Sequence, residues 1–121
     1  MSDPENLGNK GEDLAVEYLS NNGYRILNRN WKWGRNEIDV IAENNEFIVF
    51  AEVKTRTADF MDDPLNAITR SKQNAIIFAA EGYMKRMGKD KECRFDVITI
   101  IMKGNDYTIE HIPDAFYPSL K

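Results

Sequence analysis

The most regular feature of the chain is a pair of short β-branched and aromatic runs, residues 36–42 and 47–54, joined by the polar segment Glu-Asn-Asn-Glu. Runs of this composition form strands, and the polar residues between them tolerate the backbone geometry of a tight turn. We therefore predict an antiparallel hairpin. Both of its faces are apolar in the middle, which is typical of strands covered by other layers on both sides. One face is expected to carry Ile38, Val40, Val49, Ala51 and Val53, and the other Ile41, Ile48 and Phe50.

The remaining pattern predicts helices and strands on either side of this hairpin. A helix is expected over residues 9–22, ending at Gly23, with an earlier start capped by Asp3 before Pro4 as the alternative. A second helix should open at Asp63-Pro64, run through Ile68 and stop at Gly88. Further strands are predicted at residues 24–33, 94–102 and 107–112, followed by a short tail that packs Phe116 and Tyr117. The order αβββαββ indicates an α/β protein, and 121 residues form a single domain with a core at about 8–117.

Charged side chains lie only at the outer ends of the two central runs: Glu37, Asp39, Glu52 and Lys54. The expected register places Ala42 opposite Phe47. In that register Asp39, Glu52 and Lys54 project from one face of the sheet within diagonal reach of one another.

Carboxylates gathered at the end of a covered sheet repel each other, and burying them without partners is costly. A divalent cation removes this conflict, because oxygen ligands are what Mg²⁺ prefers. Lys54 could then orient a water molecule or contact a phosphate. The alternative is a surface ion pair between Glu52 and Lys54, which would contribute little.

Composition narrows the class of protein. Hydrophobic residues at 42% and charged residues at 30% are ordinary for a soluble globular chain. No apolar run has membrane-spanning length and the amino terminus has no signal-peptide character, so we expect no membrane association. A single cysteine, Cys93, fits a reducing cytoplasm, and one Cys with one His argues against a zinc site of the Cys/His type.

Charge favours a local rather than a general nucleic-acid surface. A net charge of −4 counts against broad phosphate binding. Four basic residues nevertheless alternate with Trp31 and Trp33, which is the composition of a surface that contacts phosphates and stacks bases: Arg25, Arg29, Lys32 and Arg35. The alternative is an edge strand whose cations discourage pairing with other sheets.

Four further residues are candidates for the site or for the core. Glu12 and Lys72 each have two interpretations, whereas Asp96 and His111 have a structural one. Glu12 shares the apolar stripe of the first helix, so it either points toward the hairpin or forms a capping box with Asn9. Lys72 lies on the apolar face of the second helix and either reaches the rim or points at an anion. Asp96 is expected to pair with an arginine, and His111 to be an ordinary strand residue.

Several motifs together resemble those of the uncharacterised bacterial YraN-like family. They are Gly11-Glu12-Asp13-Leu14-Ala15 with Tyr18-Leu19, the segment 23–31, Glu37-Ile38-Asp39-Val40-Ile41, Glu52-Val53-Lys54-Thr55-Arg56, Lys72-Gln73 and Arg94-Phe95-Asp96-Val97. That family is similar in fold to archaeal Holliday-junction resolvases and restriction endonucleases, and the Asp39…Glu52-x-Lys54 pattern resembles the PD-(D/E)xK nuclease signature. The resemblance implies a restriction endonuclease-like three-layer fold, with a mixed central sheet flanked by helices.

The same resemblance implies a set of roles. Glu12, Asp39, Glu52 and Lys54 would be catalytic, with Mg²⁺ or Mn²⁺ held by Asp39, Glu52 and the backbone carbonyl of Val53. Arg56 and Lys72 would join the nucleic-acid-binding residues, and Glu37 and Gln73 would be accessory. Asn36 stands where the family often has Gly.

The expected function is a metal-dependent nuclease acting on DNA, for example branched or damaged DNA, with a homodimer as one arrangement that the resemblance allows. The alternative is a nucleic-acid-binding or protein-interaction module that keeps the fold without catalysis. A small-molecule enzyme is disfavoured, because the chain has no Gly-rich cofactor loop.

Overall fold

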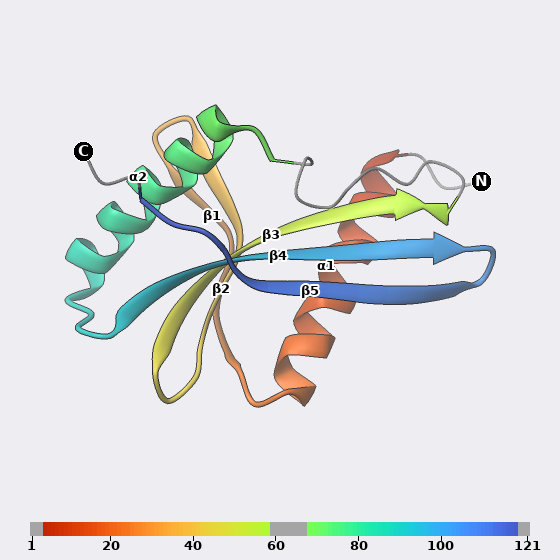
Figure 1. Ribbon diagram of the computed structural model, residues 1–121, viewed down its shortest axis with the longest axis horizontal. Helices are drawn as coiled ribbons and strands as arrows, with labels where there is room; N and C mark the ends of the chain where they lie inside the picture. Colours follow the sequence, from red (N-terminus) through yellow and green to blue (C-terminus); the bar gives the residue numbers. More distant parts are fainter. Residues whose placement is uncertain (1–3, 59–67, 119–121) are drawn as a thin grey trace.

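A computed structural model describes residues 4–58 and 68–118 of the chain. Two helices and five strands follow one another as α1 (Pro4–Asn21), β1 (Arg25–Trp33), β2 (Asn36–Glu43), β3 (Phe47–Thr57), α2 (Arg70–Met87), β4 (Glu92–Lys103) and β5 (Asp106–Phe116) (Figure 1). The predicted α/β class and the order αβββαββ are confirmed.

The strands form one mixed sheet in the order β1-β2-β3-β4-β5. Neighbours pair antiparallel except β3 and β4, which run parallel along the whole of β3. Parallel neighbours need a crossover, and the segment containing α2 supplies it. The expectation that the strand after the second helix is parallel to an earlier one is confirmed.

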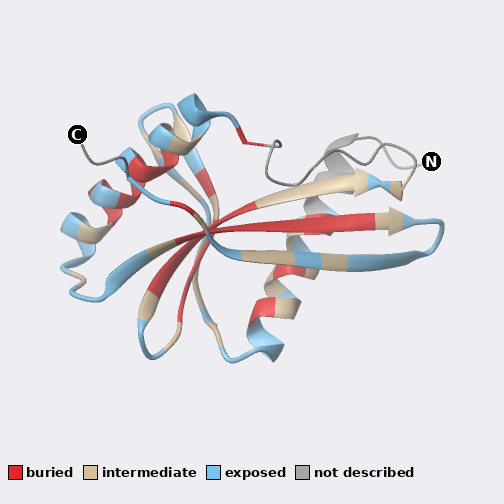
Figure 2. Ribbon diagram, viewed as in Figure 1, coloured by how far each residue is buried: buried red, intermediate tan, exposed pale blue. Residues whose placement is uncertain are grey.

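Alternating side chains of the central strands build two hydrophobic clusters. On β3, Phe50 belongs to the cluster under α2, whereas its neighbour Ala51 belongs to the cluster under α1. Successive strand residues point to opposite faces, so the two helices cover opposite sides of the sheet in a three-layer arrangement. This arrangement is consistent with a restriction endonuclease-like fold. Buried residues concentrate in the middle of the sheet and on the inner side of α2, while the outer part of β5 is exposed (Figure 2).

One residue of the hairpin lies on the face opposite to the predicted one. Ile38 was expected beside Val40, but it packs in the α2-side cluster while Val40 packs under α1. The pairing of β2 with β3 extends only from Glu43 to Val40. Beyond that point the β1–β2 hairpin bends away from β3 toward α2 (Figure 1), so strict alternation relative to β3 no longer holds.

The first helix begins at the earlier of the two predicted positions, Pro4. Its proposed cap, Asp3, lies outside the described residues. The helix ends before Gly23, which has a φ of 88° that residues with a side chain rarely adopt.

The second helix begins later than predicted. Its N-cap is Thr69, whose backbone is extended and whose hydroxyl accepts a hydrogen bond from the amide of Lys72 at 3.1 Å. The extended backbone of Thr69 separates Ile68 from the helix, so the prediction of a helix running through Ile68 is wrong, and Asp63-Pro64 lies outside the described residues. The predicted stop at Gly88, with a φ of 62°, is confirmed.

Strands β3 and β5 are longer than predicted. Phe116 is the buried last residue of β5 rather than part of a tail, because its ring stacks on that of Phe95 with 5.4 Å between centroids. Tyr117 was expected to pack as well, but it is exposed.

Two glycines set how closely the helices approach the sheet. A Cβ on Gly11 of α1 would lie 2.0 Å from Oγ1 of Thr55 on β3, and one on Gly82 of α2 would lie 2.5 Å from the ring of Trp33 on β1. Neither position has room for a side chain, so each glycine permits the packing that brings its helix to the sheet.

Candidate active site

The central hairpin has a different register from the one expected. Ala42 pairs with Val49 rather than with Phe47, because the turn closes between Asn44 and Phe47: the Asn44 amide donates to the Phe47 carbonyl at 3.1 Å, and Oδ1 of Asn44 accepts from the Phe47 amide at 2.8 Å. The difference is two residues. A shift of two leaves the paired residues, 40–43 and 48–51, on their predicted faces.

Asp39 lies where β2 separates from β3, immediately beyond the last recorded pair, Val40 with Ala51. Its Oδ2 accepts a hydrogen bond from the Val53 amide at 2.8 Å. A side-chain carboxylate thus binds a β3 amide just past the end of the ladder. This contact orients the Asp39 side chain toward β3.

Asp39 and Glu52, with Glu12 of α1, form a group that we call the acidic cluster. Glu52 is buried, with 4% of its side chain exposed. Its Oε1 lies 3.4 Å from Nζ of Lys54 on the same strand and 3.3 Å from Nζ of Lys72 on α2. The Glu52–Lys54 ion pair considered from the sequence is therefore present. It is not a surface pair, because the carboxylate is buried and shared with a lysine from another element.

Burial and mutual repulsion raise the pKa of Asp39 to about 7, with burial the larger cause and the Glu52 carboxylate the second. The Val53 amide and the Lys72 ammonium act in the opposite direction. A carboxyl group that ionises near neutral pH beside a second acid and two lysines is typical of functional sites.

Glu12 brings α1 to the same cluster. Because Gly11 permits contact with Thr55, this turn of the helix lies against β3, and the charge of Glu12 is one of the causes that raise the pKa of Asp39. The Oε1 atom of Glu12 is buried without a hydrogen-bond partner, and burial raises the pKa of this carboxyl group. The capping-box alternative is wrong, because α1 begins at Pro4 and Asn9 lies inside the helix.

Asn30 is a member of the site that the sequence analysis missed. It lies on β1 between the pairs Arg29–Val40 and Trp31–Ile38, and therefore opposite Asp39. Its φ of 50° is in the left-handed region, and its side chain lowers the pKa of Glu12. Asparagine tolerates this conformation better than most residues, but nothing in a single sequence marks one asparagine of a strand as having it.

The sequence model of an uncharacterised protein family, UPF0102, matches residues 11–100. The chain belongs to this family. It is 46% identical to a UPF0102 protein of Chlorobium phaeobacteroides, over 95% of this chain and 96% of the relative. It is also 42% identical to one of Bacteroides fragilis, over 99% of each, and 38% identical to one of Parabacteroides distasonis, over 97% of each. The matched region includes every residue of the acidic cluster, so the cluster belongs to the part of the chain that defines UPF0102.

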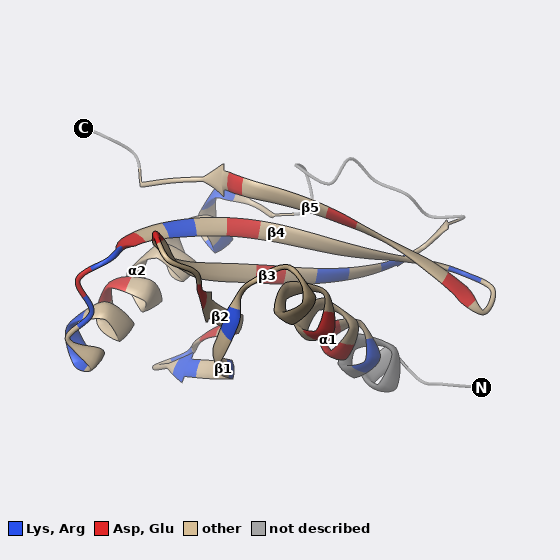
Figure 3. Cartoon of the chain, turned by 90° about the horizontal axis from the view of Figure 1, so that it is seen from below, with Lys and Arg blue, Asp and Glu red and all other residues tan. Residues whose placement is uncertain are grey.

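The basic residues predicted to bind nucleic acid do not form one surface in this UPF0102 protein. Arg25 forms an ion pair with Glu43 at the far end of the hairpin, and Arg29 forms one with Asp13 of α1 at 2.7 Å. Lys32 pairs across β1 and β2 with Glu37, an exposed residue. Lys and Arg are interspersed with acidic residues over the molecule (Figure 3).

Of three other predicted contributors, two have local partners and one is exposed. Arg56 donates to the carbonyl oxygen of Thr55 at 3.1 Å. Gln73 donates to the Ile68 carbonyl at 3.2 Å, which makes it part of the start of α2 rather than of the acidic cluster. Arg35 is exposed in the turn between β1 and β2.

The tryptophans of β1 do not form the exposed, base-stacking surface that their alternation with basic residues suggests. Trp31 packs edge-to-face on Tyr83 of α2 and stacks on Trp33, with centroid distances of 5.1 and 5.5 Å. Both rings are turned toward the helix, so β1 itself does not offer two free indoles.

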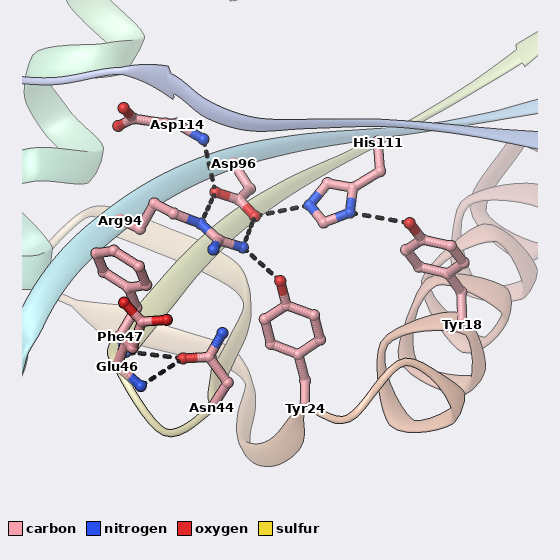
Figure 4. Close-up of polar contacts among 9 residues, drawn as sticks. All are labelled: Tyr18, Tyr24, Asn44, Glu46, Phe47, Arg94, Asp96, His111 and Asp114. Atoms are coloured by element: carbon pink, nitrogen blue, oxygen red, sulfur yellow. Dashed lines mark hydrogen bonds and ion pairs between the residues drawn. The ribbon is translucent and has the colours of Figure 1, made fainter.

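A second group of polar side chains surrounds Asp96, which is fully buried on β4 (Figure 4). Arg94 donates to both of its carboxylate oxygens, at 3.0 and 2.8 Å, and His111 Nε2 forms a hydrogen bond with Oδ2 at 2.7 Å. The structural pairing predicted for Asp96 is therefore present. Burial acts to raise the pKa of this carboxyl group, but the hydrogen bonds from His111, Arg94 and a backbone amide outweigh it and the pKa lies below its ordinary value.

The prediction for His111 is wrong. Its Nδ1 lies 3.0 Å from the hydroxyl of Tyr18, so this histidine links α1 to Asp96 (Figure 4). Arg94 extends the network to the Tyr24 hydroxyl at 2.6 Å. His111 and Asp96 are distant in sequence, and only the pairing of β4 with β5 brings them together. The network joins the amino-terminal helix to the carboxyl-terminal hairpin.

Asp39 and Glu52 fit a divalent cation better than the Asp96 network does. Among residues 4–58 and 68–118, no three His, Cys, Asp or Glu side chains gather closely enough to hold a metal ion. Mg²⁺, however, keeps several waters and is commonly bound through only one or two carboxylates. Two acids that repel each other, next to an orphaned buried oxygen of Glu12, provide such a donor set. Asp96 is already neutralised by its partners.

Within the part of the chain that the structure describes, neither helix is long and apolar enough to cross a membrane.

Proposed function

We propose that this UPF0102 protein is a Mg²⁺- or Mn²⁺-dependent nuclease that hydrolyses phosphodiester bonds in cytoplasmic DNA. The observation that carries the proposal is the position of Asp39 and Glu52. The two acids lie on neighbouring strands near the point where β2 separates from β3. Asp39 has a pKa of about 7 because it is buried and lies beside Glu52.

Each side chain of the cluster has a task that follows from its contacts. Asp39, held by the Val53 amide, and Glu52 would bind the cation together with the backbone carbonyl of Val53. The bound cation would supply electrophilic assistance to the phosphate and a more acidic water. Lys54, from the same strand as Glu52, would orient the attacking water or contact the phosphate.

Lys72 and Glu12 complete the surroundings. Lys54 of β3 and Lys72 of α2 both form ion pairs with Glu52. Their ammonium groups would balance the negative charge of this buried carboxylate when no metal is bound. Glu12 would accept a hydrogen bond from a water bound to the cation, because its buried Oε1 has no hydrogen bond and its ion-pair partner, Nη2 of Arg29, lies 4.0 Å away.

The test is cleavage of forked, four-way-junction and plain duplex DNA with Mn²⁺, with Mg²⁺ and with EDTA. We expect metal-dependent cleavage by the wild type and a loss of at least a hundredfold in Asp39→Asn and Lys54→Ala. The matched control is Glu110→Gln, an exposed acid on β5, which should cleave like the wild type. Cleavage that persists in EDTA or in both site variants would refute the proposal.

The alternative function is a nucleic-acid-binding module without catalysis. It is favoured by the acidic net charge of −4 and by the two lysines that already satisfy Glu52. In that case DNA is bound but not cut with any metal, and Asp39→Asn leaves the affinity unchanged.

A further inference from the structure

An open groove lies between β1 and the outer side of α2, about three residues along β1 from Asn30 and the acidic cluster. It has a volume of about 510 Å³ and is lined by Trp33, Phe78, Glu81, Gly82, Lys85 and Arg86. Three residues of a strand span roughly 10 Å. The groove is therefore separate from the acidic cluster but within reach of the same bound nucleic acid.

The walls of the groove are aromatic and cationic. Phe78 is 60% exposed, although it is a large apolar residue on a helix whose other face is buried. Arg86 lies over the ring of Trp33, 4.9 Å from the ring centroid. Gly82 lets the Trp33 ring pack directly on α2 as one wall of the groove, because a Cβ there would lie 2.5 Å from that ring.

We propose that this groove binds an unpaired nucleobase of a single-stranded or branched nucleic acid, which stacks on Phe78 while Lys85 and Arg86 contact the flanking phosphates. The assignment rests on the proposed function for the nature of the ligand, but not for the binding itself. An aromatic side chain next to cations is the combination that holds single strands without regard to sequence.

Charge selects this occupant over a second copy of the chain. The groove is lined by two cations, Lys85 and Arg86, and by one acid, Glu81, in a protein whose net charge is −4. A two-fold symmetric dimer through this face would bring the same cations against one another, which is unfavourable. A polyanion with apolar bases matches both the charge and the aromatic surface.

Phe78→Ala tests the proposal without threatening the core, because the side chain is mostly exposed. The control is Tyr107→Ala, another exposed aromatic residue, at the β4–β5 turn far from the groove in sequence. Affinity for a fluorescent 12-nucleotide single strand and for the matching blunt duplex is measured in EDTA. Loss of one stacked base corresponds to about 5- to 150-fold weaker binding, and we expect this loss only for Phe78→Ala and only on the single strand.

Two further measurements identify the contacts. A strand carrying 2-aminopurine should lose fluorescence when it binds the wild type and keep it with Phe78→Ala, because stacking quenches the base. Arg86→Gln should reduce the slope of log affinity against log salt, as expected on removal of a phosphate contact.

The proposal is overturned if the wild type does not bind single strands, if Phe78→Ala binds like Tyr107→Ala, or if the loss is equal on the duplex. It is also overturned if sedimentation shows a wild-type dimer that Phe78→Ala dissociates, since the occupant would then be a second copy. The binding assay contains no free metal and the cleavage assay is separate. Phe78-dependent binding in EDTA, together with no cleavage when Mg²⁺ or Mn²⁺ is supplied, would refute the nuclease and leave the groove. Metal-dependent cleavage with unchanged Phe78→Ala binding would do the reverse.

Discussion

Replacing Asp39 with asparagine should make the protein more stable at alkaline pH. In the wild type the Asp39 carboxylate accepts a hydrogen bond from the backbone amide of Val53 at 2.8 Å, and the side-chain oxygen of asparagine can still accept it. The substitution removes a negative charge that lies near both Glu52 and Glu12. What is lost is the attraction of Asp39 to Lys72, which is the smallest of the causes acting on its pKa.

The size and sign of the effect follow from the raised pKa. The folded protein holds the Asp39 proton until about pH 7, whereas the unfolded chain releases it near pH 3.8. The wild type therefore loses stability as the pH rises from about 4 to about 7, by about 4 kcal/mol in all. The asparagine variant has no such proton. Between pH 5.5 and 8.5 its advantage over the wild type should grow by about 2 kcal/mol.

Urea unfolding followed by tryptophan fluorescence at pH 5.5 and 8.5, at equal ionic strength, measures this difference. The matched control is Asp13→Asn on α1, whose side chain is 66% exposed and pairs with Arg29. It should change the free energy of unfolding by less than about 1 kcal/mol at both pH values. Two results would contradict this prediction: the same stability difference at both pH values, or a variant that is less stable than the wild type at pH 8.5. Either would mean that folding does not raise the pKa of Asp39.

Three other substitutions test how the fold holds the site. Gly11→Ala should destabilise the protein by about 1–3 kcal/mol, because its Cβ would overlap Oγ1 of Thr55; adding Thr55→Ala should recover most of the loss in a urea titration. Gly82→Ala should cost a similar amount and change the tryptophan emission, because its Cβ would press on the Trp33 ring. Asp96→Asn should cost about 3–5 kcal/mol at pH 7, since it leaves the partly buried Arg94 without its charge partner. The difference in the free energy of unfolding between the wild type and Asp96→Asn should shrink as the pH falls below about 4. The reason is that the pKa of Asp96 is lower in the folded protein than in the unfolded chain.

Controls for these variants come from exposed positions on the same elements. Glu17→Gln on α1 and Glu81→Ala on α2 lie on the outer sides of their helices and should change the free energy of unfolding by less than about 0.5 kcal/mol. If Gly11→Ala is as mild as Glu17→Gln, or if Thr55→Ala does not rescue it, close packing of α1 is not what positions Glu12. If Asp96→Asn is as mild as a surface change, the buried network does not hold α1 to the carboxyl-terminal hairpin.

Much of the fold was determined by local sequence. The two covered strands of the hairpin, the order of elements and the stop of α2 at Gly88 all follow from composition and spacing, which depend on neighbours in the chain. The approach of Asp39 to Glu52 and the faces of the paired residues of β2 and β3 were also predictable, even though the register was wrong by two residues. Side chains in a strand alternate with a period of two, so an even error leaves the face unchanged.

Other features of the structure depend on contacts between segments that are distant in sequence. The side of Ile38 depends on where β2 leaves β3, which no local pattern records. The left-handed backbone of Asn30 is imposed by its surroundings opposite Asp39. The ion-pair partners of the basic residues could not be predicted either, because they are distant in sequence. Arg29, for example, is 16 residues from Asp13.

Local sequence is therefore enough to predict which elements form and which residues of paired strands share a face, because those properties repeat with the period of a helix or a strand. Three contacts arise only in the folded protein: Glu52 pairs with both Lys54 and Lys72, His111 binds Asp96, and the Trp33 ring packs against Gly82. Each of these joins residues from different elements. Their distances are set by how helices pack on the sheet, and that packing depends on the whole chain at once.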